Sequence, residues 1–237
     1  MEKLWTQLQE NALFLGITFL IVLALGLGAK LAEKLLPQIR KVSRARRVCI
    51  IAICGAIAAV LHMLDFPLPF LAPGFYKLDL SEVPVMLCGF FLGPSAAVVC
   101  EVLKILLKLM FKSTSTAFVG DFANFVVGCT MVLPAVFIYH AHKSRHSAVM
   151  GLILGTVCMA GLGSLFNALY LIPKFSELYG LPLETIIARG TQINGNIQSL
   201  TSFVLIAVVP LNLIKGLLVS ILTMLLYKRV ARPLFGK

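Results

Sequence analysis

The sequence predicts an all-α, polytopic membrane protein. Of its 237 residues, 59% are hydrophobic and only 13% are charged, whereas soluble domains carry roughly 25% charged residues. The mean hydropathy is +0.95, and several apolar runs approach the roughly 20 residues that a membrane-spanning helix needs. So much apolar surface does not fit inside a water-facing globule, which excludes a soluble enzyme, a nucleic-acid-binding domain and a disordered chain.

The first two spans are predicted at residues 12–29 and at about residues 48–64. The first is not interpreted as a signal peptide, because Glu2 and Lys3 cancel in charge and no small-x-small cleavage site follows the apolar run. Prolines within residues 65–79 exclude a regular helix, so this segment is predicted to be a loop.

The remaining spans are predicted from apolar runs and the residues that interrupt them. Ser81 is the expected N-cap of a short helix with Glu82 at its positive end, and Gly93 and Pro94 end that helix. The predicted spans lie at about residues 83–92, 95–111, 117–139, 148–172 and 200–227, and a polar loop is expected at residues 173–196. Seven spans result, with no internal repeat and no separate soluble domain.

The basic residues predict the orientation of these spans. Most lysines and arginines fall in residues 30–47, at 143 and 145, and after residue 227. Cytoplasmic loops of membrane proteins carry an excess of such residues. The N-terminus is therefore expected outside the cell and the C-terminus in the cytoplasm.

Polar side chains inside predicted spans are costly in lipid, so they indicate functional positions. Asn212 and Lys215 lie three residues apart and share one helix face, beside a backbone that Pro210 loosens. Asn124 and Asn167 are flanked by apolar residues and are expected to approach this face, which would give a polar ligand site within apolar walls. Structural bonding between helices is the alternative for all of them.

Two further patterns allow more than one interpretation. Glu101, Lys104 and Lys108 have the spacing of an internal ion pair, which suits either a neutralised packing face or a coupling role. Ala52 and Ala56 form a ridge of small residues, and so do Gly55 and Ala59. Each ridge allows close packing inside the bundle or docking of another membrane subunit.

No metal site, disulfide framework or phosphate-binding loop is predicted. His140, His142 and His146 are interpreted as a solvated cluster at the end of a span. The six cysteines lie in or beside apolar runs without a C-x-x-C pair, and no G-x-x-x-x-G-K-[ST] sequence occurs. A protein of this kind that does work draws its energy from elsewhere.

Five short stretches, in this order, resemble the substrate-binding (S) component of energy-coupling factor (ECF) transporters, and most closely its riboflavin-specific type. They are DFPLPF at 65–70, KLDLSEVP at 77–84, GFFLGP at 89–94, GDFANFVVG at 120–128 and PLNLIKG at 210–216. The resemblance implies a six-helix core at residues 47–237. Residues 1–46 would then be an additional N-terminal transmembrane helix and a basic cytoplasmic linker.

The resemblance also implies a function and a set of site residues. The chain would be a transport subunit rather than an enzyme, without a cofactor, in the plasma membrane of a prokaryote. It would bind riboflavin at the outer face and dock through Ala52 and Ala56 on a transmembrane coupling subunit driven by two cytoplasmic ATPases. The implied substrate-binding residues are Asn167, Asn212, Lys215, Asn124, Lys77 and Asp79.

Three alternatives stay open. One is an S component for another vitamin, because the residues alone do not select a flavin. An autonomous proton-coupled carrier would use Glu101 and Lys104, although the missing inverted repeat counts against it. A lipid-acting membrane enzyme would need a nucleophile or metal cluster. The role of the additional helix is open, including an effect on docking.

Overall fold

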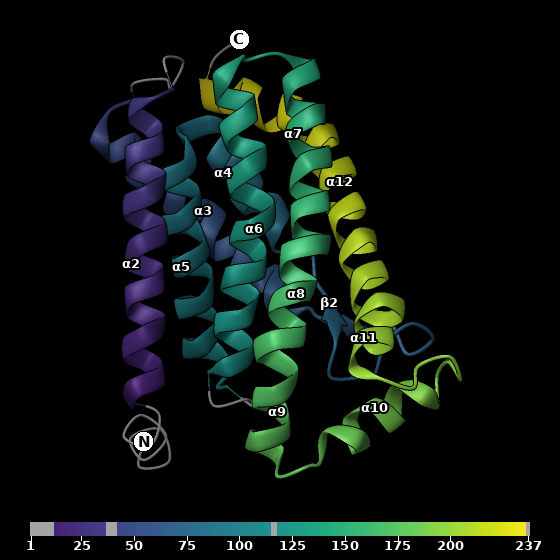
Figure 1. Ribbon diagram of the computed structural model, residues 1–237. Helices are drawn as coiled ribbons and strands as arrows, with labels where there is room; N and C mark the ends of the chain where they lie inside the picture. Colours follow the sequence, from purple (N-terminus) through teal and green to yellow (C-terminus); the bar gives the residue numbers. More distant parts are fainter. Residues whose placement is uncertain (1–11, 37–41, 115–117, 236–237) are drawn as a thin grey trace.

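The computed structural model describes residues 12–36, 42–114 and 118–235, which form a bundle of long helices (Figure 1). The helices are α2 (Ala12–Lys34), α3 (Arg44–Met63), α4 (Glu82–Leu92), α5 (Pro94–Phe111), α6 (Val119–Ala141), α7 (Arg145–Cys158), α8 (Ser164–Phe166), α9 (Ile172–Tyr179), α10 (Leu183–Thr191), α11 (Leu200–Phe203) and α12 (Val209–Phe235). Three π-helical segments are η1 (Met159–Gly163), η2 (Asn167–Leu171) and η3 (Val204–Val208). The predicted all-α membrane bundle is confirmed.

A two-stranded antiparallel pair interrupts the segment between α3 and α4. Strands β1 (Phe66–Pro67) and β2 (Lys77–Leu78) pair Phe66 with Leu78 and Pro67 with Lys77. The prediction of a non-helical segment at residues 65–79 is confirmed, and this small hairpin is an addition to it.

Five helical segments in the described part of the chain are long and apolar enough to cross a membrane: Gly16–Lys34, Arg44–Met63, Val119–Ala141, Arg145–Glu177 and Leu200–Val230. The other two predicted spans differ from these. Helix α4 has 11 residues, all buried, so it extends only about 16 Å. Helix α5 carries three charged side chains, and two of them are fully buried. Protein rather than lipid therefore surrounds much of this pair.

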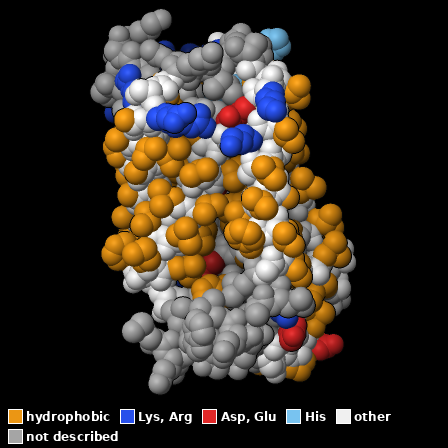
Figure 2. All heavy atoms as spheres, turned by 90° about the vertical axis from the view of Figure 1, so that its left-hand side faces the viewer, with side chains coloured by type: hydrophobic (Ala, Val, Ile, Leu, Met, Phe, Trp, Pro, Cys, Tyr) orange, Lys and Arg blue, Asp and Glu red, His pale blue; other side chains and the backbone are white. Residues whose placement is uncertain are grey.

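The surface has the distribution expected of a membrane bundle. On the side that α2 covers, hydrophobic side chains form a broad band, and lysines and arginines gather at one end of it (Figure 2). Figure 1 places the C-terminus at that same end. Exposed large apolar side chains on most of the long helices supply the band, and lipid is the solvent that suits it.

Local chemistry accounts for several helix boundaries. Ser43 and Ser144 cap α3 and α7, with their hydroxyl oxygens accepting from backbone N–H groups. Gly93 separates α4 from α5 at φ 104°, a value that L side chains rarely adopt, and Pro94 then starts α5. Ser81 occupies the N-cap position of α4 as predicted, but its side chain donates to Glu82 instead of capping the helix.

The expected polar loop at residues 173–196 is largely helical, so that prediction was wrong. Helix α9 continues directly from η2, and Pro173, which has no N–H to donate, lies at the junction of the two. Gly180, at φ 60°, reverses the chain before α10. Buried Phe175 and Ile186 hold both helices against the bundle. The segment is helical despite its polar composition, because its apolar residues recur at helical spacing and can be buried against the bundle.

The described histidines also differ from the expectation. His140 is fully buried, and its Nε2 lies 2.9 Å from the carbonyl oxygen of Gly89 on α4. Only His142 and His146 are solvent-exposed. The predicted solvated cluster was therefore wrong for His140, which helps to pack α6 against α4.

Helix α2 lies beside α5 and contacts α6 more weakly (Figure 1). Its C-terminal turn is fastened by Glu33, whose Oε1 accepts from the Ser95 backbone N–H at 2.8 Å and from the Ser95 hydroxyl at 2.6 Å. Arg47 on α3 donates to the same hydroxyl at 2.7 Å. Glu33 thus places a negative charge at the positive end of α5.

Candidate functional site

Lys215 on α12 lies between two buried carboxylates. Its Nζ is 3.0 Å from Asp79 Oδ2 and 3.0 Å from Glu82 Oε2. Asp79 follows β2, Glu82 begins α4, and all three side chains are at least nine-tenths buried. A lone buried ammonium would be costly, and two carboxylates compensate it here. Two segments distant in sequence, the stretch from Asp79 to Glu82 and helix α12, therefore meet at one polar centre.

Two amides lie along the neighbouring seam between the α8 region and α12. Asn212 Nδ2 donates to the Ser164 hydroxyl at 3.2 Å. Asn167 Nδ2 donates to the Gly163 carbonyl at 2.7 Å, and its Oδ1 accepts from the Tyr76 hydroxyl at 2.9 Å. A Cβ on Gly163 would lie 3.6 Å from Asn212 Nδ2, an ordinary van der Waals distance. The two amide-bearing segments therefore lie side by side at this point.

Wider turns of the backbone flank these amides. Asn167 is the first residue of η2, and Asn212 follows η3 and Pro210 by a few residues. Such π-helical turns occur frequently at functional sites, because they shift side chains and carbonyls out of the regular helical register. The predicted loosening of the backbone near Asn212 is confirmed, and a matching distortion lies at Asn167.

A second lysine extends the polar centre into α5 and α6. Lys104 Nζ is 2.6 Å from Glu101 Oε2, 3.3 Å from Glu82 Oε1 and 2.9 Å from Asn124 Oδ1. Glu82 thereby joins Lys104 to Lys215 in one network. The predicted Glu101–Lys104 ion pair is confirmed.

Glycine and a separate ion pair complete this region. A Cβ on Gly128 would lie 2.6 Å from Glu101 Oε1, so only glycine leaves room for that carboxylate. Lys108 pairs with Asp121 at 2.6 Å instead of with Glu101. The charges of α5 therefore face protein, which is why they are compatible with a membrane bundle.

Asp79 is strongly held in its ionised form. Burial opposes ionisation, but the Lys215 ammonium and then His62 outweigh it and hold the pKa of Asp79 well below its ordinary value. His62 Nδ1 lies 3.4 Å from Asp79 Oδ2, and the Ser81 backbone N–H donates to Asp79 Oδ1 at 2.9 Å. The segment between α3 and α4 is thus tied electrostatically to α12.

The predicted site residues separate into two groups. Asn167, Asn212, Lys215 and Asp79 lie around one seam, and Asn124 reaches it through Lys104 and Glu82. Lys77 is exposed on β2 and pairs with Asp65 at 3.1 Å. Its contacts therefore hold the hairpin together at the protein surface.

Sequence reasoning missed three members of this arrangement as site residues. Glu82 was interpreted only as a charge at a helix start, although an acid inside an otherwise apolar helix is itself a signal. Tyr76 lies in the predicted loop, and Ser164 lies in a long apolar span. Nothing in their sequence surroundings distinguishes these two residues from structural ones.

The two ridges of small residues on α3 point to different sides. Gly55 and Ala59 are buried, and a Cβ on Gly55 would lie 2.6 Å from a Leu103 side-chain carbon of α5. Ala52 and Ala56 are exposed. One ridge therefore packs inside the bundle, and the other remains accessible although α2 is present.

Comparisons with known proteins show which family the chain resembles in sequence. The family model for the substrate-specific component of ECF transporters matches residues 46–227. The chain is 34% identical to the riboflavin transporter RibU of Staphylococcus aureus, over 78% of this chain and 90% of that protein. It is 27% identical to the riboflavin transporter FmnP of Bacillus subtilis, over 78% of this chain and 91% of that protein.

A solved structure gives the same result for the fold. That structure, described as the S component of a bacterial ECF transporter, is matched with a TM-score of 0.64 and 35% sequence identity. The match covers 81% of this chain and 99% of the solved chain. The chain belongs to the family of substrate-specific components of ECF transporters.

Proposed function

We propose that this chain captures riboflavin at the outer face of the membrane for ATP-driven uptake by an ECF energising module. One observation carries the proposal: amides and charges from the α3–α4 segment, η2 and α12 converge on one seam, in a family whose relatives include named riboflavin transporters. A flavin combines a flat apolar ring with a polar edge and a hydroxylated chain. Apolar helix faces with a few fixed polar groups suit such a ligand.

The roles of the polar groups follow from their chemistry. Asn167 and Asn212 each offer both a donor and an acceptor, which suits the pyrimidine-like edge and the ribityl hydroxyls. Lys215 supplies a donor whose position Asp79 and Glu82 fix. Asn124 contributes through Lys104, and Lys77 with Asp65 supports the edge of the entrance.

Entry of the ligand requires movement of the segment between α3 and α4. Tyr76 and Ala72 of this segment are buried against apolar side chains of α9 to α12. The Tyr76 hydroxyl donates a hydrogen bond to Asn167 Oδ1, so this oxygen already has a partner in the closed arrangement. In the proposed mechanism this segment and residues 173–196 open to admit riboflavin and close over it. Opening breaks the Tyr76–Asn167 hydrogen bond and exposes apolar side chains, and binding of the ligand offsets that free-energy cost.

Orientation, partners and domain roles complete the proposal. Lysines and arginines at the C-terminal end of the bundle support a cytoplasmic C-terminus and an outer N-terminus in a prokaryotic plasma membrane. Residues 47–237 would form the transport core, and residues 1–46 an added helix with its linker. Ala52 and Ala56 would dock on a transmembrane coupling subunit that two cytoplasmic ATPases drive, so the chain itself would need no catalysis and no cofactor.

A titration of purified protein into riboflavin tests the ligand. We expect saturable one-to-one quenching of flavin fluorescence, with much weaker binding for Asn212→Ala. Gln198→Ala, which removes an exposed amide before α11 and outside residues 173–196, is the matched control and should bind as the unchanged protein does. If monodisperse protein did not quench flavin fluorescence, riboflavin would be excluded as the ligand, and other vitamins would be tested next.

An uptake assay distinguishes the carrier alternative. In proteoliposomes without ATPases, an autonomous proton-coupled carrier accumulates riboflavin when a pH gradient is applied. A substrate-binding subunit does not accumulate it until the energising module and ATP are supplied. Accumulation without the module would contradict the proposed role and favour coupling through Glu101 and Lys104.

A further inference from the structure

A cavity with a volume of about 730 Å³ opens near the end of the bundle where α6 turns into α7 and α12 approaches its C-terminus. This volume lies within the roughly 300–1,000 Å³ of typical ligand pockets. Lys228, which lines the cavity, is 13 residues after Lys215 on the same helix, a separation of about 20 Å along a helix axis. The cavity is therefore distinct from the proposed riboflavin site.

Three cations surround the mouth of this cavity. Lys143 and Arg145 come from the α6–α7 turn, and Lys228 comes from α12. All three side chains are exposed, and the lining residues that the structure describes include no aspartate or glutamate. The mouth is thus strongly electropositive, and its charge complements an anion.

Below the cations the walls become apolar. Ile153 of α7 and Ile221 and Leu225 of α12 line the cavity and remain about half exposed or more, at 53%, 48% and 64%. Ile221 lies seven residues before Lys228, and Ile153 lies eight after Arg145, which corresponds to about 10–12 Å of helix. The walls therefore continue along the bundle into its apolar band.

Three aromatic side chains that line the cavity combine apolar rings with polar hydroxyl groups. Tyr139 and Tyr227 share a hydrogen bond between their hydroxyls, and Phe90 packs against the Tyr139 ring with centroids 4.5 Å apart. Tyrosines of this kind suit the boundary between headgroups and hydrocarbon, because their rings are apolar and their hydroxyls polar. The change from charged to aromatic to aliphatic lining matches the layers of a phospholipid.

We propose that this cavity binds one anionic glycerophospholipid of the surrounding leaflet. Lys143, Arg145 and Lys228 would hold the phosphate through charge-assisted hydrogen bonds. The tyrosine pair would lie at the level of the glycerol, and an acyl chain would follow Ile153 and Ile221. Basic pockets between membrane helices favour such headgroups, and the apolar walls favour a lipid over a free anion. The site connects α7 to α12 at the end opposite the substrate.

Native mass spectrometry of delipidated protein with phosphatidylglycerol or phosphatidylcholine tests this proposal. We expect phosphatidylglycerol to be retained at least fivefold more than phosphatidylcholine. The triple variant Lys143→Ala, Arg145→Ala and Lys228→Ala should reduce its retention at least fivefold. The charge-preserving triple Lys143→Arg, Arg145→Lys and Lys228→Arg should keep most of it.

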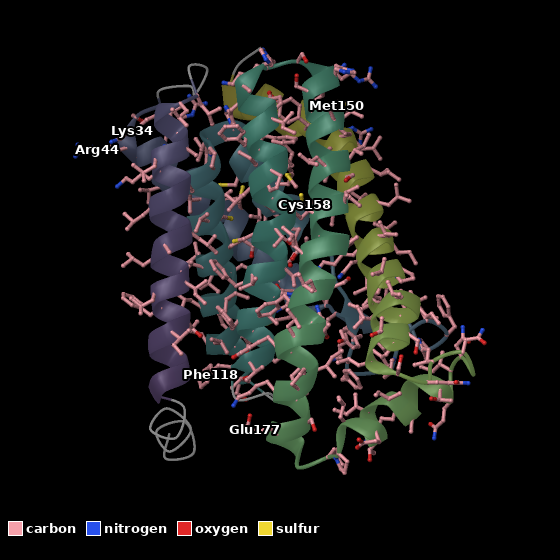
Figure 3. All side chains as sticks on the ribbon, viewed as in Figure 1. Lys34, Arg44, Phe118, Met150, Cys158 and Glu177 are labelled. Atoms are coloured by element: carbon pink, nitrogen blue, oxygen red, sulfur yellow. The ribbon has the colours of Figure 1, made fainter. Side chains whose placement is uncertain are left out.

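A matched control removes three cations from the other side of the same end. Lys34 and Arg44 lie across the bundle from Met150 of α7 (Figure 3), and all three control side chains are exposed. The variant Lys30→Ala, Lys34→Ala and Arg44→Ala should change retention less than twofold. An equal loss in this control would overturn the proposal, because it would indicate a general charge effect.

A charge-neutral variant tests the cavity itself. Val149→Trp places a large ring in the cavity from a partly exposed position, and we expect it to exclude the lipid while the protein stays monodisperse. If Val149→Trp retained phosphatidylglycerol as well as the unchanged protein does, the lipid would not bind in this cavity and the proposal would be wrong. Inorganic phosphate or glycerol 3-phosphate at millimolar concentration should not displace phosphatidylglycerol from the protein. Displacement would overturn the proposal, because it would indicate that the cavity binds a free anion.

Discussion

At the level of single residues, Lys215 shows how a charge can reside inside a membrane bundle. Asp79 and Glu82 each hold its ammonium at 3.0 Å, and Glu82 is also 3.3 Å from Lys104. Removing one member of a buried pair typically costs about 3–5 kcal/mol, because its partner stays buried without compensation. The network therefore makes ligand binding and stability depend on the same side chains.

Lys215→Ala is expected to weaken riboflavin binding more than tenfold, because it removes a fixed donor from the seam. Its melting temperature should also fall, since Asp79 and Glu82 lose their shared cation. Flavin quenching by the monodisperse fraction measures the affinity. Lys34→Ala, which removes an exposed ammonium from α2, serves as the control, and an unchanged affinity in Lys215→Ala would reject the site.

Tyr76→Phe is expected to speed riboflavin association about fivefold. Its hydroxyl donates to Asn167 in the closed arrangement, and a neutral hydrogen bond contributes about 1 kcal/mol, which the opening step would no longer lose. Stopped-flow quenching measures the rate constant. Slower or unchanged association would show that opening at Tyr76 does not limit entry.

At the level of elements, the additional helix α2 is fastened to the bundle without approaching the candidate site. Its apolar contacts involve Val98 of α5 and Phe125 of α6, and Glu33 binds the start of α5 through Ser95. The site residues come from other segments. Ala52 and Ala56 on α3 stay exposed. This arrangement favours a bracing role for α2.

Deletion of residues 1–41 is therefore expected to leave riboflavin affinity within twofold of the intact chain. The melting temperature should fall by a few degrees, because apolar surface on α5 and α6 becomes exposed and the hydrogen bonds of Glu33 are removed. Quenching titrations and thermal unfolding of the two purified chains provide the comparison. Loss of binding by a well-folded truncated chain would assign α2 a part in the site.

At the level of the whole molecule, the proposed ligand site and the proposed docking surface lie in different places. The polar seam lies inside the bundle, whereas Ala52 and Ala56 lie on an exposed face of α3 with Ile53 and Ile57. Small residues allow a partner helix to approach closely. Capture and transport should therefore be separable by mutation.

The double variant Ala52→Trp and Ala56→Trp is expected to abolish riboflavin uptake in cells that contain the energising module. Purified variant protein should keep its riboflavin affinity, because bulk is added only on the outer face. Leu169→Trp, at a position 74% exposed, controls for a tryptophan on the surface. Normal uptake by the double variant would place docking elsewhere.

Particular residues show how far prediction from sequence reached. The face shared by Asn212 and Lys215 and the Glu101–Lys104 pair followed from helical spacing, a local property that tertiary contacts did not alter. The helices within residues 173–196 and the burial of His140 were missed. Both depend on apolar surfaces that other parts of the chain supply.

The sequence by itself determined the membrane class, the long apolar helices and the few positions where polarity interrupts them, because hydrophobic transfer and helical periodicity act over neighbouring residues. Only the tertiary structure decided which polar groups meet. Lys215 contacts Asp79 across 136 residues of sequence, and Tyr76 reaches Asn167 across 91. Such meetings depend on helix packing and on π-helical turns that rotate side chains. The physical reason is that polar groups inside a bundle that lipid surrounds need partners from the protein, and only the fold brings those partners together.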